Sequence, residues 1–386
     1  MRKDKTKKFR TAFLLIVLGL FFLHGSLLAA DSTRTLDNEE MNSGWKAFIA
    51  PFLFANSDDG LILGGGFGLS HEPGLYLISG FEFTTKGNNI VGLEAEWRRT
   101  HATIATRMMM GRSKRYIYPA SGIDPEFDIE SEVEEYEFRF SYLRNYSEKF
   151  EMGPTFWYEN LRGLNATDKN KNSVDVDNYL ELTSCYTVMA GYRARLYSTR
   201  STIRPLDGYI LDLKSMGGVS KSKPWKDVKG DFYSEVFFAF AKPIQKNVRT
   251  YVRLASSYQP NTPTPLRNYL GGDDRLRGQP DRRDFGNGVI WGRNQIHFTL
   301  TRSFDWPQRV AHSIFDFFPT WPLEVELIPF YDYGSTYDKN KGWGRTRHGI
   351  GCGLHFILPP ELVVRLDLAS SPGGDIHYYF SLGQSL

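Results

Sequence analysis

The feature that most constrains this chain is an alternation of apolar and polar residues with a period of two. It is clearest at residues 135–142, where aromatic side chains at even positions are separated by Glu, Arg and Ser. The same alternation runs through residues 91–98 and 361–368. Because successive side chains of a β-strand point to opposite faces, this period predicts strands with one apolar face rather than helices.

Two architectures give every strand one apolar and one polar face. In a soluble sandwich the apolar faces form the core, whereas in a transmembrane barrel they meet lipid and the polar faces line the lumen. Aromatic residues are abundant, at 15% of the chain, and many lie on the apolar faces, as the interfacial aromatics of membrane barrels do. We therefore predict an all-β fold, a transmembrane antiparallel β-barrel.

The N-terminal residues predict export. Six basic residues against one acidic residue in the first ten positions lead into an apolar run at residues 12–23, and Ala29 and Ala30 follow. This is the layout of a secretory signal peptide with cleavage after Ala30. The alternative is a membrane-anchor helix, which needs about 20 apolar residues, and the run is shorter than that.

The connection lengths also favour a barrel. The connections after odd-numbered strands are often long, and the connections after even-numbered strands are mostly short. This is expected of a barrel with an even number of strands, which has long external loops and short periplasmic turns. The long ones are at 111–133, 163–177, 218–230, 259–293 and 335–347. We expect about 16 strands, at 45–56, 58–70, 73–84, 89–100, 102–110, 134–146, 149–162, 178–196, 206–217, 231–241, 246–258, 294–303, 323–334, 348–357, 361–370 and 376–385.

One connection on the short side departs from this pattern. Residues 304–322 are rich in aromatics and contain prolines at both ends. They suit a short amphipathic helix lying at the inner membrane interface, or a docking surface for a periplasmic partner. The sequence does not decide between these two interpretations.

The predicted organisation is a signal peptide at 1–30, a short periplasmic segment at 31–43 and an outer-membrane barrel at 44–386. The predicted location is the bacterial outer membrane, with the barrel crossing it many times and in contact with its lipids. The formal net charge is +3, but the basic excess lies in the first ten residues and the remainder is net negative. A nucleic-acid partner is therefore not expected.

Motifs for catalysis or metal binding are not found. The sequence contains neither a Gly-x-Ser-x-Gly nucleophile elbow nor a His-Glu-x-x-His zinc motif. Two cysteines cannot form a disulfide framework, and we expect both Cys185 and Cys352 to be free, with Cys352 facing lipid. We predict no enzymatic activity, no cofactor and no metal. The alternative is a protease or phospholipase site assembled from distant strands of the barrel wall.

The longest connection, 259–293, carries the first candidate site residues. Adjacent glycines precede Leu276, Arg277 and Gly278. Glycine permits backbone turns that other residues avoid, and a guanidinium can bind a carboxylate through two hydrogen bonds. We expect Arg277 to seek an acidic partner.

The thirteenth predicted strand supplies that partner. Asp332 alternates with the apolar residues of its strand, so it has the opposite parity (odd or even position) and should face the lumen, together with Phe330 and Gly334. If the loop folds inward, Arg277 can reach Asp332. The alternative is that Arg277 is a solvated external residue and Asp332 a carboxylate wetted by the lumen.

These residues resemble those of the BamA/TamA-type outer-membrane surface-antigen barrels, which include the assembly and two-partner secretion transporters. In that family the sixth external loop folds into a sixteen-stranded barrel and ends in a hydrophobic-Arg-Gly-aromatic tip, which residues 276–278 match. The family's Phe-x-Asp-x-Gly motif on the thirteenth strand matches residues 330–334. The resemblance extends over the chain from about residue 44 and includes Pro205-x-Asp207-Gly208, Gly349-x-Gly351-x-Gly353 and Arg365-x-Asp367.

The end of the chain resembles the C-terminal insertion signal of such barrels, through Tyr379, Phe380, Leu382, Gly383 and Leu386. Three departures from the family pattern stand out. Gln279 replaces the aromatic after Arg-Gly, the last residue is not aromatic, and residues 31–43 leave no room for the periplasmic domains that usually precede the barrel.

The resemblance implies a barrel that helps the insertion or export of envelope proteins through a lateral seam or through its lumen. Its partners would be client envelope proteins or a separate periplasmic protein. Because the usual periplasmic domains are missing from the sequence, we keep an alternative: a passive channel, or a structural barrel or anchor that works with a separate periplasmic partner.

Overall fold

The computed structural model describes residues 45–56, 60–71, 75–84, 88–99, 101–117, 129–168, 170–175, 184–198, 207–223, 228–263, 266, 268–272, 275–280, 283–301, 324–358, 362–374 and 376–383. Residues from Gly44 to Leu386 form one compact unit. The expectations for the signal peptide, the segment 31–43 and the insertion at 304–322 lie outside the described residues. No helix among the described residues is long and apolar enough to cross a membrane.

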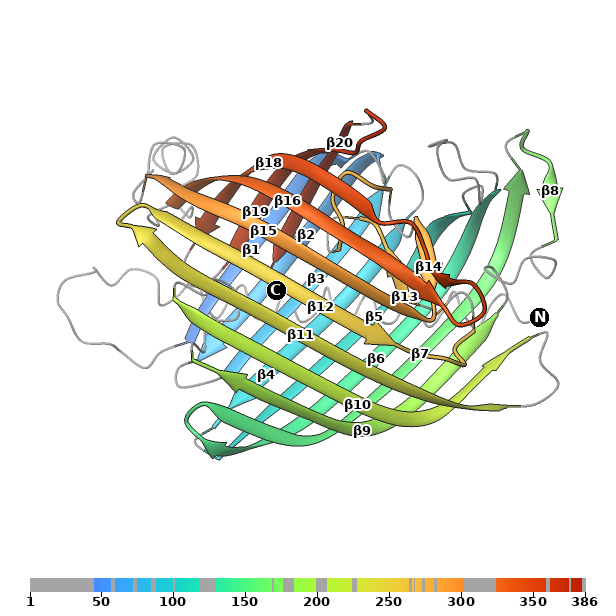
Figure 1. Cartoon of the computed structure of the whole chain (residues 1–386), viewed down its shortest axis with the longest axis horizontal. Helices are drawn as coiled ribbons and strands as arrows, with labels where there is room; N and C mark the ends of the chain where they lie inside the picture. Colours follow the sequence, from blue (N-terminus) through green and yellow to red (C-terminus); the bar gives the residue numbers. More distant parts are fainter. Residues whose placement is uncertain are drawn as a thin grey trace, which may run out of the picture. The chain divides into compact units, whose positions relative to one another are not determined.

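The unit is all-β, as predicted, and one antiparallel sheet contains every strand except β13 and β14 (Figure 1). The strands of its first half are β1 (Trp45–Asn56), β2 (Gly60–His71), β3 (Leu75–Thr84), β4 (Asn89–Arg98), β5 (Ala102–Ile117), β6 (Ile129–Ser147), β7 (Phe150–Asp168), β8 (Ser173–Val174), β9 (Cys185–Tyr197) and β10 (Gly208–Ser222). Those of its second half are β11 (Lys229–Gln245), β12 (Val248–Tyr258), β15 (Gly288–Thr301), β16 (Glu324–Asp338), β17 (Gly342–Trp343), β18 (Arg347–Leu358), β19 (Leu362–Ser370) and β20 (Ile376–Gly383). A separate short hairpin joins β13 (Asn268–Leu270) and β14 (Asp284–Gly286).

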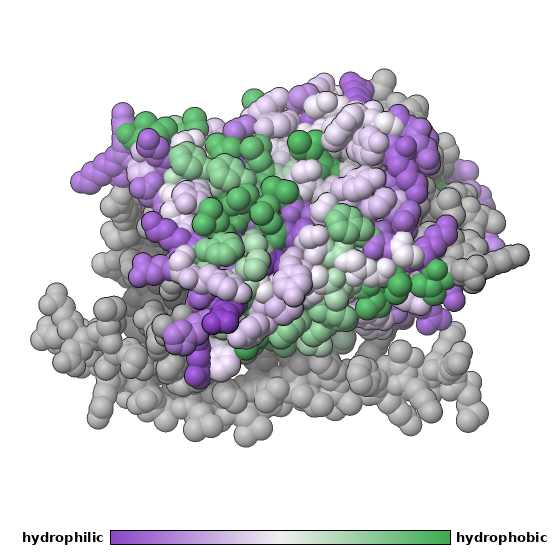
Figure 2. All heavy atoms as spheres, turned by 60° about the horizontal axis from the view of Figure 1, so that its bottom comes forward, coloured by the Kyte–Doolittle hydropathy of each residue, from purple (hydrophilic) through white to green (hydrophobic). Residues whose placement is uncertain are grey.

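The two faces of the sheet differ in polarity. On the inner face, charged and amide side chains are buried, among them Asp212, Arg253, Gln295, Glu326 and Asp332. On the outer face, large apolar side chains are exposed, among them Tyr192, Leu213, Ile290, Ile350 and Leu368. An apolar exterior around a polar interior is the arrangement of transmembrane barrels. Figure 2 shows one outer face, with apolar side chains gathered in its middle and hydrophilic ones toward its two ends.

The cysteines agree with this division of faces. Neither of them takes part in a disulfide, as predicted. Cys352 is exposed on the outer face between Ile350 and Leu354, whereas Cys185 is buried on the inner face.

Several strands are longer than predicted at the end with the long connections, which is the right-hand end of Figure 1 where β8, β13 and β14 lie. The predicted loop 111–133 is in large part strand, because β5 continues to Ile117 and β6 begins at Ile129. Here the outward side chains form ion pairs, such as Arg112 with Glu132 at 3.2 Å. There the outward side chains are charged and the inner face buries Ile129 and Val133, so the outward apolar alternation ends while the backbone ladder continues. The same error affects 163–177 and 218–230, where β7 continues to Asp168 and β10 to Ser222.

The sheet has one interruption. The strands β1 and β20 are neighbours, but among the described residues no hydrogen-bonded ladder joins them. Ladders do join all other neighbouring long strands, from β1–β2 through β19–β20. We call the junction of β1 and β20 the seam.

Candidate functional site

The candidate site forms where the connection between β12 and β15 reaches the inner face of the sheet. This connection turns back on itself at two glycines with positive φ, Gly271 at 121° and Gly272 at 82°. The amide of Gly272 donates to the carbonyl of Gln279 at 3.1 Å, and the amide of Leu276 donates to the carbonyl of Gly272 at 3.1 Å. We call residues 275–280 the loop tip.

Leu276 fixes the tip by burial. It is 0% exposed and packs in a cluster with Leu270, Val289 and Trp291. Leu270 belongs to the short hairpin and the other two to β15, so the tip, the hairpin and the wall share one apolar core. Removing such a side chain from water contributes roughly 1.5–3 kcal/mol.

Arg277 is held by two carboxylates. Its side chain is 0% exposed, and its Nε and Nη2 donate to Asp332 of β16 at 2.7 and 2.9 Å. Its backbone amide also donates to Asp332, at 3.2 Å. Its Nη1 donates to Asp367 of β19 at 2.9 Å. The structure thus brings Arg277 to Asp332 and adds a second acidic partner.

The charge of Arg277 is stabilised by these neighbours. Burial alone lowers the pKa of its guanidinium, but the charges of Asp332 and Asp367 raise that pKa above its ordinary value. Arg293 lies further away, with its Nε 3.7 Å from Asp332. The Nε2 of His355 lies 3.1 Å from Oδ1 of Asp367 and donates to it in the tautomer that carries the proton on Nε2.

The other residues of the Phe-x-Asp-x-Gly motif support the same contact. The ring of Phe330 lies under the guanidinium, with its centroid 3.3 Å from the Cζ of Arg277. This is a cation–π geometry, which is strongest where water is excluded. Gly334 leaves room for the hairpin, since a Cβ there would lie 2.6 Å from Leu270.

Three glycines on the inner face of β18 let the tip approach the wall. A Cβ at Gly349 would overlap the carbonyl oxygen of Arg277. A Cβ at Gly351 would lie 2.5 Å from the ring of Phe330, and one at Gly353 would overlap the carboxylate of Asp367. The Gly-x-Gly-x-Gly run therefore makes space for the loop tip and for two of the groups that hold it.

The tip also contacts the last strand. The amide of Gly278 donates to the hydroxyl of Tyr379 at 3.0 Å, and this hydroxyl donates to the carbonyl of Gln279 at 3.1 Å. Tyr379 is 5% exposed and packs with Phe330 and Ala369. The tip thus contacts β16, β18, β19 and β20, and it reaches the strand that borders the seam.

The other residues of the predicted insertion signal are less informative. Phe380 is buried on the face of β20 opposite to Tyr379, and Leu382 and Gly383 belong to the same strand. Leu386 lies outside the described residues. The role of these residues in membrane insertion stays a prediction.

A second set of buried hydrogen bonds holds the start of the long connection, which we call its root, against β11. Asp231 of β11 is 7% exposed and accepts hydrogen bonds from Gln259 Nε2 at 3.0 Å, from Thr262 Oγ1 at 2.6 Å and from the amide of Asn261 at 3.1 Å. Sequence reasoning missed this residue. Its inward parity on β11 is the one signal that could have found it.

Tyr379 offers a test of the contact between the tip and β20. Tyr379→Phe keeps the packed ring and removes two hydrogen bonds, so it should destabilise the barrel by about 1–2 kcal/mol. The measurement is the temperature at which the folded band disappears on unboiled gels. Tyr378→Phe, on the outer face of the same strand, is the control, and equal shifts for both variants would contradict the contact.

The arrangement holds the loop tip against the inner face of the sheet. Among the residues that the structure describes, no group of three or more His, Cys, Asp and Glu side chains is placed to hold a metal ion. The buried charges of the tip are engaged with each other, and the geometry they create fixes one loop against one wall.

Solved structures with a similar fold include BamA from Haemophilus ducreyi lacking POTRA domains 1–3, which is 12% identical, with a TM-score of 0.51 over 89% of this chain and 71% of that one. CdiB from Acinetobacter baumannii is 12% identical, with a TM-score of 0.54 over 89% of this chain and 60% of that one. CdiB from Escherichia coli is 10% identical, with a TM-score of 0.57 over 88% of this chain and 63% of that one. No family model and no curated protein matches the sequence.

These likenesses define the fold: a β-barrel of the kind seen in BamA and CdiB. The chain covers less than two thirds of either CdiB chain.

Proposed function

We propose that the protein is an outer-membrane barrel that helps the insertion or export of envelope proteins at the seam between β1 and β20. The observation that carries this proposal is that no ladder joins β1 and β20 in the described part of the chain, whereas ladders join the other neighbouring long strands. The barrel likeness to BamA and CdiB and the motifs at the loop tip support it.

The physical reason lies in the backbone of the seam. An edge strand presents unpaired amide and carbonyl groups that can pair with another strand. In lipid such groups have no water to bond, and each unsatisfied group is costly. A client strand that pairs with β1 or β20 would satisfy its own backbone groups while it enters the bilayer. This step needs no covalent chemistry and no cofactor.

The fastened loop favours the seam over the lumen as the route. The long connection is held at its root by Asp231 and at its tip by Arg277, and both contacts are buried. A route through the lumen would require both fastenings to open. A route through the seam leaves them in place.

Cross-linking the seam tests this proposal. In a Cys185→Ser/Cys352→Ser background, cysteines replace Leu53 of β1 and Ile376 of β20 and are joined by a bifunctional thiol reagent. We expect the joined barrel to lose client handling, measured as a severalfold fall in newly assembled envelope proteins in the outer-membrane fraction. The matched control joins positions 354 and 366, which already face each other across the paired strands β18 and β19.

The alternatives give different results. A passive channel conducts steadily in planar bilayers and keeps that conductance when the seam is joined. A structural anchor leaves envelope proteins unchanged in both cross-linked forms. Either result would overturn the proposal.

A further inference from the structure

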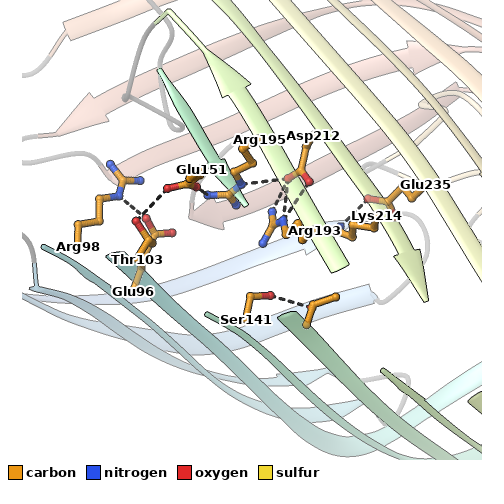
Figure 3. Close-up of polar contacts among 11 residues, drawn as sticks. Glu96, Arg98, Thr103, Ser141, Glu151, Arg193, Arg195, Asp212, Lys214 and Glu235 are labelled. Carbon is orange, nitrogen blue, oxygen red and sulfur yellow. Dashed lines mark hydrogen bonds and ion pairs between the residues drawn. The ribbon is translucent and has the colours of Figure 1, made fainter. Parts of the chain in front are cut away.

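A second polar region lies on the wall formed by β4 to β11, apart from the strands that hold the loop tip. Here a cavity of about 190 Å³ opens among charged side chains (Figure 3), and its lining includes Arg98, Glu151, Arg193, Arg195, Asp212 and Lys214. These side chains come from four different strands, β4, β7, β9 and β10. The cavity is smaller than the roughly 300–1,000 Å³ of pockets for drug-sized ligands.

The cavity lies toward the end of the barrel that carries the short turns. Arg98 ends β4 just before the turn to β5, and Glu151 follows the turn between β6 and β7. Ile210 lies near the start of β10 and also lines the cavity. In an outer-membrane barrel, short turns face the periplasm.

The carboxylates of the cavity are already engaged. Asp212 accepts from Arg193 Nε at 3.0 Å and from Arg195 Nε at 3.1 Å. Glu151 accepts from Arg195 Nη1 at 3.3 Å and from Thr103 Oγ1 at 3.0 Å. Figure 3 shows these contacts as one continuous row. The acidic groups therefore have their charge balanced within the wall.

The cationic side chains of the cavity have N–H donors that their ion pairs do not use, which we call spare donors. A guanidinium carries five N–H donors. Arg193 uses its Nε and Nη2, and Arg195 its Nε and Nη1. The Nη1 of Arg193 and the Nη2 of Arg195 have no partner within the described part of the chain. Lys214, bonded to Glu235 at 2.5 Å, likewise has more donors than this one contact uses.

The charges of the cavity are balanced. The pairs of Arg193, Arg195 and Lys214 with three carboxylates cancel, and Arg98 is paired with Glu96. Arg99 also lines the cavity, but its guanidinium lies 4.2 Å from the ring centroid of Trp97, whose side chain is exposed on the outer face. Arg99 is therefore not counted in this balance, and what the cavity offers a ligand is its spare N–H donors.

We propose that this cavity binds the carboxylate of an acidic side chain, above all glutamate, on an unfolded polypeptide that enters from the short-turn end. The spare N–H donors match a carboxylate, whose hydrogen bonds to guanidinium are strong. Tyr197, Ile210 and Phe237 line the same cavity and suit the aliphatic stem of glutamate. The choice of a polypeptide as the carrier rests on the proposed function.

The test measures peptide binding to the full-length barrel in detergent micelles. Two fluorescent extended peptides of equal length are compared by anisotropy, one with three glutamates and one with glutamine at the same positions. We expect the glutamate peptide to bind at least about tenfold more tightly at low salt, which corresponds to one charge-assisted contact. The difference should shrink as salt screens the charges.

Two variants locate the binding. Arg193→Gln leaves Asp212 bonded by Arg195, and Lys214→Gln removes the other donor group; each should weaken the glutamate peptide about tenfold. The control is Arg112→Gln on β5, an arginine that is paired with Glu132 and Glu134 on the outer face near the long connections. Heat-shift gels show that each variant is folded.

Three outcomes would overturn the proposal. The first is that the two peptides bind equally tightly. The second is that Arg112→Gln weakens binding of the glutamate peptide as much as both cavity variants do. The third is that free glutarate or inorganic phosphate binds and the glutamate peptide does not. The cross-linked seam reports separately on the proposed function. A barrel that binds the glutamate peptide but whose joined seam changes nothing contradicts the proposed function and leaves the cavity assigned to a carboxylate.

Discussion

Arg277→Ala is expected to destabilise the barrel by about 3–5 kcal/mol, because it leaves two buried carboxylates without the guanidinium that they share. Asp332 and Asp367 are 0% and 4% exposed. Without Arg277, the nearest cation to Asp332 is Arg293, whose Nε lies at 3.7 Å. Water that entered to solvate the two acids would also loosen the loop tip, so a rise in conductance should accompany the loss.

Because Arg277 has two acidic partners, Arg277→Ala and Asp332→Ala should not destabilise the barrel equally. Asp332→Ala leaves the guanidinium bonded to Asp367 at 2.9 Å, so this variant should lose less than Arg277→Ala. The double variant should lose about as much as Arg277→Ala alone, since residues in one network do not act additively. Unfolding in urea and the heat-shift temperature on gels give the four free energies of the cycle. Small and additive effects of the two single variants would show that the contact contributes little to stability.

The sequence predicted which residues point inward and which outward, and the structure explains why. Parity is a local property of a strand, so Asp332 and Cys352 could be assigned from their neighbours alone. Strand ends could not, because the ladder of β5 and β6 continues past the apolar band, where Arg112 and Glu132 face outward as an ion pair. The alternation therefore marked the apolar band rather than the strand.

The candidate site was predictable only in part, for a related reason. Arg277 and Asp332 stood out through their motifs and their chemistry. Asp367 and Tyr379 belong to segments that resemble the family, but nothing in the sequence pairs them with the loop tip. They share the inward parity of many other polar residues, and what brings them to the tip is their position along their strands. Those quantities depend on the register of β16, β18, β19 and β20, which the alternation does not give.

The glycines of β18 give the second large effect. Gly349→Ala would place a Cβ in overlap with the carbonyl oxygen of Arg277, which belongs to the backbone and cannot rotate away. The tip must then move off the wall, and the bonds of Arg277 to its two acids must lengthen. Overpacking of this kind typically costs about 1–3 kcal/mol, and the partial loss of the buried ion pair should bring the total to the upper end of that range.

Gly217→Ala is the matched control, because nothing lies within 4 Å of a Cβ at that position of β10. It should leave both stability and conductance near those of the parent. Gly349→Ala should lower the heat-shift temperature and raise single-channel conductance in planar bilayers, since a displaced tip opens the lumen. Combined with Arg277→Ala, it should add little, because the contact that it disturbs is already lost. If Gly349→Ala instead behaves like Gly217→Ala, the tip does not rest on β18, and the fastening of the loop must be sought at Asp231.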